Sequence, residues 1–480
     1  MATAYPHPMQ PAMYAEQRVR LAKELRSQGA GHAAVFQGGT EVPVNSSDTS
    51  YLFRQESYYE YLFGYSTPDC FGAVLASGHS IVFIPRLPAS YAVWMGELPT
   101  CENIRELLQV NEVKYVDELA ATLTSHNVEA IHVMSGVNSD SGLQVLRAFF
   151  DGIENFNVID TFLYRALATQ RLTKTDLEKE VLKYVCRVSS NAHIHVMQSC
   201  KPGMSQHQLE SLFLHHVYFH GGCRRVSYTC ICATGHHGAV LHYPNNDAPV
   251  EDGGMALLDM GGEYRCYASD ITCSFPVNGK FTENQRKIYN AVLEAHDAVL
   301  RQLKAGINWV DMHRLALRIM CGRLLEAGIL QNATVDELMA HQIMRLFQPH
   351  GMGHLIGLDV HDVGGYLDNS PARPEAADCC KLRTARDLEA GYYVTVEPGC
   401  YFNHTLLAAA FQDAAIKNFL NEDLIRSTFW NFGGVRIESD VLITEDGAIN
   451  FTVVPRTVEE IEATMSGQAF NGAVVTHKNI

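Results

Sequence analysis

The sequence predicts two domains, an α/β domain followed by an α+β domain. The chain has 480 residues, which is more than one hydrophobic core usually organises. Residues 1–169 alternate short β-branched strands with helical segments, whereas residues 170–480 combine hairpins with long amphipathic helices. We therefore expect the second part to pack helices on a curved antiparallel sheet, with the domain boundary near residue 170.

Four strands are predicted in the first domain. Residues 32–39 (HAAVFQGG) form one, and the runs FGAVLAS and SIVFIPRL form two more that are joined by a turn around Gly78. Residues 129–135 (EAIHVMS) form another. Because they are short, β-branched and interrupted by helical segments, these strands indicate an α/β arrangement.

Two long helices are predicted in the second domain. Thr175 and Glu178 form a capping box, and apolar residues then recur at helical spacing until a Lys-Pro-Gly sequence at 201–203 ends the helix. Thr282 and Gln285 form a second capping box before another apolar stripe. Strand-like runs follow at YYVTVEP and GGVRIESDVLIT, so hairpins and amphipathic helices alternate through this domain.

Composition and charge exclude several classes of partner. The formal net charge is −16 and the sequence has no dense basic block, so we do not expect nucleic acid to bind. The N-terminus lacks a basic region followed by an apolar one, and no apolar run approaches membrane-spanning length. The thirteen cysteines are irregularly spaced, as is typical of reduced thiols. We therefore expect a cytoplasmic protein with no membrane contact.

Two aspartates lie within the stretch DMGGEYRCYASDITCSF, which otherwise has the pattern of strands and a tight turn. If the strands on either side of residues 261–266 pair, Asp259 and Asp270 become cross-strand neighbours on one face. Two bare buried carboxylates would repel each other and lose solvation, so we expect a positive charge between them. A metal ion would also explain the apolar flanks, although an exposed, solvated face remains the alternative for this stretch alone.

Three histidines follow in FQPHGMGHLIGLDVHDVGG. His350, His354 and His361 are interleaved with five glycines, which allow the backbone to approach other segments closely. A lone histidine is more often a buried residue of the core. Three within twelve positions favour a site instead.

Two glutamates complete a possible ligand set. Glu397 is the only charge in YVTVEPG, and in GGVRIESD the residues Arg436 and Glu438 are two apart and so share a strand face. Each motif alone is weak, because edge strands often carry one glutamate. Together, two Asp, one His and two Glu can hold two divalent ions with bridging carboxylates. Such oxygen-rich ligation suits Mn²⁺, although Zn²⁺ or Co²⁺ could occupy it.

The ordered motifs DMGG(x7)D, HG(x2)GH, VEPG and GGVRIE resemble the binuclear-metal peptidases of the pita-bread fold, which include methionine aminopeptidase, aminopeptidase P and Xaa-Pro dipeptidase. Further strings, among them FRQES, VFIPRLPAS, LRTAR and VPRTVEEIEA, are similar to Xaa-Pro dipeptidase (prolidase) of the eukaryotic type. Similar segments run from about residue 15 to 465. The resemblance implies a pita-bread catalytic domain over 170–480, behind an aminopeptidase P-like α/β domain over 1–169.

The resemblance also implies roles for individual residues. The metal ligands of the family fall on Asp259, Asp270, His354, Glu397 and Glu438. The substrate-contacting positions fall on His242, His361 and Arg383, with Arg436 and Tyr228 as supporting members.

The implied reaction is the metal-dependent hydrolysis of Xaa-Pro dipeptides by a hydroxide that bridges two divalent ions, with Mn²⁺ favoured. His361 or His242 would stabilise the oxyanion, and Glu397 would pass the water's proton to the proline nitrogen. Arg383 would bind the proline carboxylate, with a surface ion pair as the alternative for this residue. In this family the segment around Trp94 can reach a neighbouring subunit, which implies a homodimer; the simpler interpretation places Trp94 in the core.

Alternative functions remain. An aminopeptidase P-like enzyme would use the same ligands on longer Xaa-Pro peptides, and a pita-bread domain can also serve as a non-catalytic binding module. The intact ligand set favours a metalloenzyme over both that module and the metal-free relatives that hydrolyse creatine. The loop at residues 367–382 departs from the family pattern and leaves the substrate preference open.

Overall fold

The computed structural model describes residues 8–478 and divides into two compact units. The N-terminal unit comprises residues 8–178, and the C-terminal unit begins at residue 179, within helix α7 (Asp176–Ser199). The domain boundary that we expect near residue 170 stays a prediction. Among residues 8–478, no helix has both the length and the apolar character needed to cross a bilayer.

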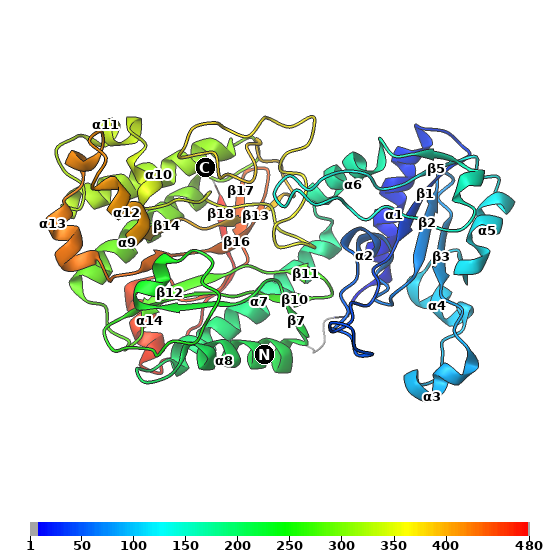
Figure 1. Cartoon of the computed structure of the whole chain (residues 1–480), viewed down its shortest axis with the longest axis horizontal. Coiled ribbons are helices and arrows are strands. Elements are labelled where there is room, and N and C mark those ends of the chain that lie inside the picture. The colour runs from blue at the N-terminus through cyan, green and yellow to red at the C-terminus, as the bar shows by residue number, and fades with distance from the viewer. Residues whose placement is uncertain (1–7, 479–480) are drawn as a thin grey trace. The chain divides into compact units, whose positions relative to one another are not determined.

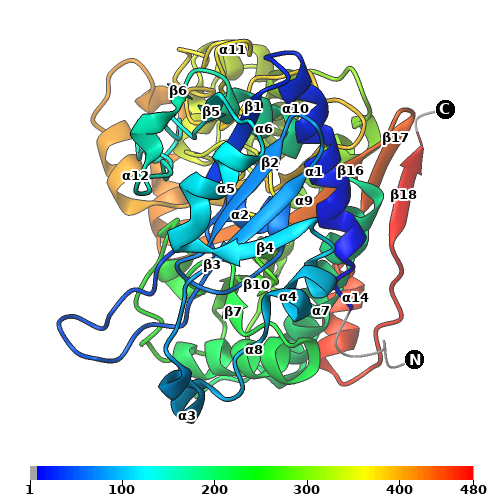
Figure 2. The ribbon, with the colours of Figure 1, turned by 90° about the vertical axis from the view of Figure 1, so that its right-hand side faces the viewer.

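The N-terminal unit is built on one mixed sheet in the order β4-β3-β2-β1-β5-β6. The strands are β1 (His32–Gln37), β2 (Phe71–Leu75), β3 (Ser80–Ile84), β4 (Glu112–Tyr115), β5 (Ala130–His132) and β6 (Asn157–Ile159). The four predicted strands are confirmed as β1, β2, β3 and β5, and β2 pairs with β3 in antiparallel fashion. Figure 2 shows β3 and β4 at one edge of this sheet.

Helices cover both faces of this sheet. Ala33 and Val35 of β1 pack in one core cluster with Leu119 and Leu123 of α5 (Leu119–Ser125). Figure 1 shows α1 (Pro11–Arg26) on the opposite side of the strands from α5. The other helices of this unit are α2 (Ser57–Phe63), α3 (Ala92–Met95), α4 (Cys101–Leu108) and α6 (Leu163–Leu172).

Trp94 does not belong to the core of this unit. It lies on α3, and 82% of its surface is exposed. The interpretation of Trp94 as a core residue is therefore wrong.

The C-terminal unit has the predicted α+β arrangement. Its strand pairs, within the described residues, are all antiparallel. One sheet has the order β12-β9-β8 and a larger one has the order β13-β16-β17-β18. Their strands are β8 (Ile231–Thr234), β9 (Met255–Asp259), β12 (Thr272–Pro276), β13 (Tyr393–Val396), β16 (Ser439–Ile443), β17 (Gly447–Asn450) and β18 (Val475–Lys478).

Long helices flank these sheets. They are α7, α8 (Gln206–Gly221), α9 (Glu283–Gln302) and α10 (Trp309–Glu326), and Figure 1 shows the strands between the pair α7/α8 and the pair α9/α10. Both predicted capping boxes are confirmed. In the first, the Glu178 carboxylate accepts from the Thr175 amide at 2.8 Å. In the second, the Gln285 side chain accepts from the Thr282 amide at 2.8 Å.

The hairpin that carries the two aspartates differs from the predicted one. Asp259 at the end of β9 pairs with Thr272, so Asp270 is not its direct cross-strand neighbour. Between them the chain forms β10 (Gly262–Tyr264) and β11 (Tyr267–Ala268), which join β7 (Arg225–Val226) in a different sheet. The two-residue turn between β10 and β11 sets this register, since Tyr264 pairs with Tyr267, and its residues Arg265 and Cys266 both have positive φ, at 50° and 66°.

The run GGVRIESDVLIT is not one strand. It forms β15 (Gly434–Arg436) and β16, with a break at residues 437–438. The partner segment breaks at the same level, because residues 397–398 separate β13 from β14 (Gly399–Tyr401). Both glutamates predicted as ligands, Glu397 and Glu438, therefore lie at breaks where a hairpin passes from one sheet to the next.

Candidate metal centre

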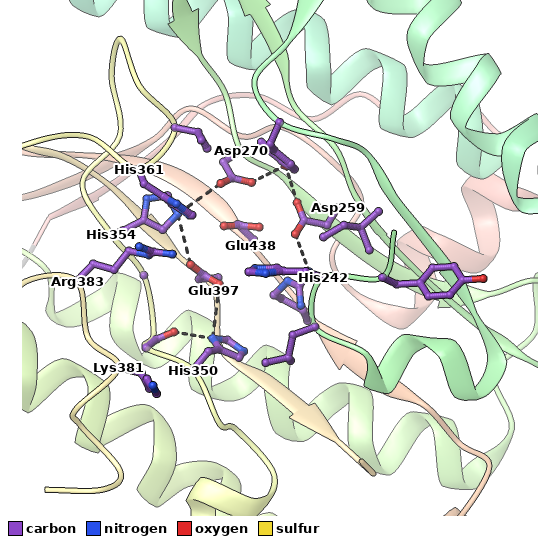
Figure 3. A pocket seen from close by; sticks show the side chains of 18 of the residues that line it. His242, Asp259, Asp270, His350, His354, His361, Lys381, Arg383, Glu397 and Glu438 are labelled. Carbon is purple, nitrogen blue, oxygen red and sulfur yellow. Dashed lines mark hydrogen bonds and ion pairs between the residues drawn. The ribbon is translucent and has the colours of Figure 1, made fainter. Parts of the chain in front are cut away.

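The C-terminal unit contains a cavity of about 640 Å³. Figure 3 shows carboxylates and imidazoles pointing toward one another inside it. All ten site residues predicted from the sequence line this cavity: Tyr228, His242, Asp259, Asp270, His354, His361, Arg383, Glu397, Arg436 and Glu438. Their separation in the sequence spans more than two hundred positions, so the fold alone brings them together.

The five predicted metal ligands form one cluster. His354 Nε2 lies 3.4 Å from Asp270 Oδ2 and 3.5 Å from Glu397 Oε1. Donor atoms of Asp270, His354 and Glu438 all lie within 4.8 Å of one another. Figure 3 shows Glu438 between Asp259, Asp270 and Glu397. These donors, one nitrogen and several carboxylate oxygens, are the kind that divalent cations bind.

The tautomer of His354 makes this cluster suitable for a cation. Its Nδ1 lies 3.0 Å from the carbonyl oxygen of Leu355, and a carbonyl only accepts, so Nδ1 carries the proton. Nε2 therefore presents a lone pair to two carboxylates. Burial lowers the pKa of His354 to about 3, which opposes protonation of this nitrogen. A metal ion would bind this lone pair together with the two carboxylates, and a backbone-anchored imidazole is typical of metal ligands.

A close backbone contact positions His354. The His354 amide donates to Thr395 Oγ1 at 3.0 Å, and the Thr395 amide donates to the His354 carbonyl at 2.9 Å. A Cβ atom on the preceding Gly353 would lie 2.1 Å from the Thr395 carbonyl oxygen, so only glycine permits this approach. The glycine of the HG(x2)GH motif thus fixes its second histidine against β13.

Three buried carboxyls of the cluster retain their protons to higher pH than they would in water. Burial raises the pKa of Asp270 and of Glu438 well above the ordinary values, and neighbouring carboxylates raise them further. Burial also raises the pKa of Glu397 to about 7. Divalent ions would replace these protons, so the residues fit a two-metal centre.

Asp259 is held by a cation and a phenol. Arg436 Nη2 donates to Asp259 Oδ2 at 2.6 Å, while Tyr228 Oη lies 2.5 Å from both Asp259 Oδ1 and Asp270 Oδ1. A phenol has one proton, so Tyr228 donates to one carboxyl and accepts from, or lies against, the other. Arg436 and Tyr228 therefore orient the two aspartates toward the same point.

The residues predicted to contact substrate, His242, His361 and Arg383, line the same cavity. The rings of His361 and His354 are 4.6 Å apart and nearly perpendicular. The segment that carries Arg383 packs tightly against the glycine pair of DVGGY, because a Cβ on Gly365 would lie 2.1 Å from the Arg383 carbonyl oxygen. The Thr384 hydroxyl also donates to the Gly365 carbonyl at 3.3 Å. This packing sets the position of Arg383 at the cavity.

Several residues of this site were missed from the sequence. Lys381 lines the cavity two positions before Arg383, and its only signal was a positive charge beside the LRTAR motif. Tyr401 had none, since an aromatic residue in a strand indicates core. Its hydroxyl accepts from Arg436 Nη1 at 2.7 Å and lies 2.9 Å from His350 Nε2. His350 Nδ1 donates to the Gly351 carbonyl, so Nε2 accepts from Tyr401.

Two parts of the chain match known protein families. Residues 180–445 match the model of metallopeptidase family M24, and residues 14–133 match that of the aminopeptidase P N-terminal domain. The chain is 48% identical to Xaa-Pro dipeptidase of Rattus norvegicus and 47% to that of Homo sapiens, covering 95% of this chain and 94% of each relative.

Solved structures show the same fold. Zn-substituted Escherichia coli aminopeptidase P in complex with product aligns with a TM-score of 0.77 at 30% identity, covering 96% of this chain and 99% of that one. Aminopeptidase PepP of Pseudomonas aeruginosa aligns with a TM-score of 0.78 at 28% identity, covering 96% and 98%. The chain therefore belongs to metallopeptidase family M24, and has the pita-bread fold with an aminopeptidase P-type N-terminal domain.

Proposed function

We propose that this chain is a metal-dependent dipeptidase that hydrolyses Xaa-Pro dipeptides with a C-terminal proline. The support is one cavity that holds a cluster of buried metal-type donors on one wall and two cationic side chains, Lys381 and Arg383, on another. The curated relatives at 47–48% identity are Xaa-Pro dipeptidases. A cavity of about 640 Å³ also suits a small substrate.

Two divalent ions, when bound, would polarise the scissile carbonyl and lower the pKa of water to about 7. We propose that Asp259, Asp270, His354, Glu397 and Glu438 hold them. Glu397 is our candidate for moving the proton to the leaving proline nitrogen, because a carboxylate that holds the ions would lie within reach of both the attacking water and the substrate. His242 and His361 would donate to the developing oxyanion.

Proline imposes particular demands on this site. The Xaa-Pro bond is a tertiary amide, and the proline nitrogen has no N–H by which an enzyme could orient it. Recognition therefore has to come from the ends of the dipeptide. We propose that Arg383 binds the proline carboxylate through its planar guanidinium and that Lys381 adds a second positive charge.

Replacing Arg383 by alanine should raise KM for Gly-Pro far more than it changes kcat. Loss of a bidentate carboxylate contact costs roughly 1.5–3 kcal/mol, or about ten- to a hundredfold in KM. Lys381→Ala should have a smaller effect, because a flexible ammonium makes no planar contact. Steady-state kinetics with the metal content measured in parallel would separate the two; an unchanged KM in Arg383→Ala would remove it from the carboxylate site.

Substrate length distinguishes the proposed activity from its nearest competitor. The structural neighbours are aminopeptidases P, which makes cleavage of longer peptides the alternative function. A site with cations placed for the carboxylate of a dipeptide should hydrolyse Gly-Pro faster than Gly-Pro-Gly. Measuring kcat/KM for both peptides with one metal-loaded preparation tests this, and the reverse order would favour an aminopeptidase.

Three finer features belong to the same proposal. Mn²⁺ is our preferred ion because the donors are mostly carboxylate oxygens, which suit a hard cation. A homodimer and a cytoplasmic location remain predictions from the sequence. Sedimentation of the metal-loaded chain and imaging of a tagged chain would test these two.

A further inference from the structure

A second cluster of metal-type donors lies in the N-terminal unit, among residues that line no part of the catalytic cavity. His79 Nε2 and His126 Nε2 each lie 2.8 Å from the same atom, Glu112 Oε1. The two imidazole rings have centroids 4.7 Å apart. Three donor atoms from three elements therefore converge within 4.8 Å.

We propose that His79, Glu112 and His126 form a further metal site, which takes a borderline ion such as Zn²⁺. Two imidazole nitrogens and one carboxylate oxygen are a common ligand set for zinc and leave a fourth position for water. The catalytic cluster, by contrast, is mostly oxygen, so the two sites should differ in the ion they prefer.

The geometry allows this ion with little rearrangement. Tetrahedral zinc has ligand distances of about 2.0–2.1 Å, which separates neighbouring donors by about 3.3 Å. The observed nitrogen–oxygen separations of 2.8 Å would open by about half an ångström. The side chains are 26–28% exposed, so an ion can enter from solvent while the site remains partly desolvated.

The charged side chain beside the cluster does not prevent a cation from binding there. One cation, Lys114, lies beside the cluster, with its Nζ 3.9 Å from the other oxygen of Glu112, Oε2. Lys114 is 43% exposed and can move away from an incoming ion. The simpler interpretation of the cluster is that each imidazole donates its Nε2 proton to Glu112. Metal binding would instead require the tautomer of each ring that carries its proton on Nδ1.

An ion here would connect three parts of the sheet edge. His79 lies in the turn between β2 and β3, Glu112 begins the edge strand β4, and His126 directly follows helix α5. Because these elements are distant in sequence, a bound ion would stabilise the folded N-terminal unit over the unfolded chain.

His126→Asn tests the site with least disturbance, because asparagine can still donate to Glu112 but is a poor zinc ligand. The full-length protein is dialysed against a series of buffered free Zn²⁺ concentrations, and bound zinc is measured by mass spectrometry. Wild type should bind one more Zn²⁺ per chain than His126→Asn. The matched control is His207→Asn, an exposed histidine on α8, which should bind as much as wild type.

Glu112→Gln is the second variant, because its amide oxygen keeps a hydrogen bond to either ring but lacks the charge. Its extra Zn²⁺ should bind at least about tenfold more weakly than in wild type. Equal zinc content in wild type, His126→Asn and Glu112→Gln at every concentration would overturn the proposal. Equal losses in His126→Asn and His207→Asn would do the same, since they would show unspecific binding to surface histidines.

Discussion

Asp270→Asn should abolish hydrolysis of Gly-Pro while leaving the protein folded. Asp270 Oδ2 lies 3.4 Å from His354 Nε2, within the buried donor cluster. Replacing this carboxylate by the amide of asparagine removes one anionic ligand. We expect kcat/KM to fall by about 10³-fold or more, which corresponds to about 4 kcal/mol of transition-state stabilisation. The measurement is activity after chelation and after Mn²⁺ is added back: wild type should recover and Asp270→Asn should not.

This variant separates metal loss from unfolding. Burial and neighbouring carboxylates raise the pKa of Asp270, which favours its neutral form in the metal-free chain, and an amide imitates that form. Asp270→Asn should therefore unfold no earlier than metal-free wild type. Asp423→Asn, an exposed aspartate of the same unit, is the matched control and should keep full activity. Full turnover in Asp270→Asn, or in rigorously demetallated wild type, would contradict the two-metal proposal.

Local sequence patterns predicted the helices and strands well, because the interactions behind these patterns join residues that are close in the sequence. The capping boxes before α7 and α9 are examples, since each is made by a side chain and an amide three residues apart. The DMGG(x7)D segment shows the limit. Its spacing suggested that Asp259 and Asp270 face each other, but the two-residue turn at 265–266 sets a register in which Asp259 pairs with Thr272.

Two residues that support the site through other side chains, Tyr401 and Asp440, were not predictable from the sequence. Tyr401 joins Arg436 to His350, and Asp440 accepts the amide of Asp270 at 3.0 Å, yet both lie in apolar strands and give no pattern of their own. Their partners are more than thirty positions away in the sequence. The five metal ligands, in contrast, could be predicted, because the motifs that carry them resemble a known family. The breaks in the strands at Glu397 and Glu438 were visible only in the structure.

The metal-free protein should lose stability as pH rises from about 4.5 to about 7. Burial, opposed in part by Arg436, raises the pKa of Glu397 to about 7, compared with an ordinary value of 4.5. In this window the folded chain binds a proton that the unfolded chain has released, so the free energy of unfolding falls as pH rises. Below pH 4.5 both states are protonated and the penalty is absent; above pH 7 it is complete, at about 3 kcal/mol.

Three further groups should steepen this loss, since burial raises the pKa of Asp270, Glu438 and Asp440 in the same direction. Urea unfolding of chelated protein at a series of pH values measures the slope. Glu397→Gln removes one titrating group and should flatten this slope of unfolding free energy against pH, whereas the exposed Glu445→Gln should not.

Divalent ions compensate the same negative charges, so metal-loaded wild type should remain stable up to neutral pH. A metal-free chain that gains stability over this window would show that the five ligands do not share one buried site, because separated and solvated carboxylates would have no reason to retain protons.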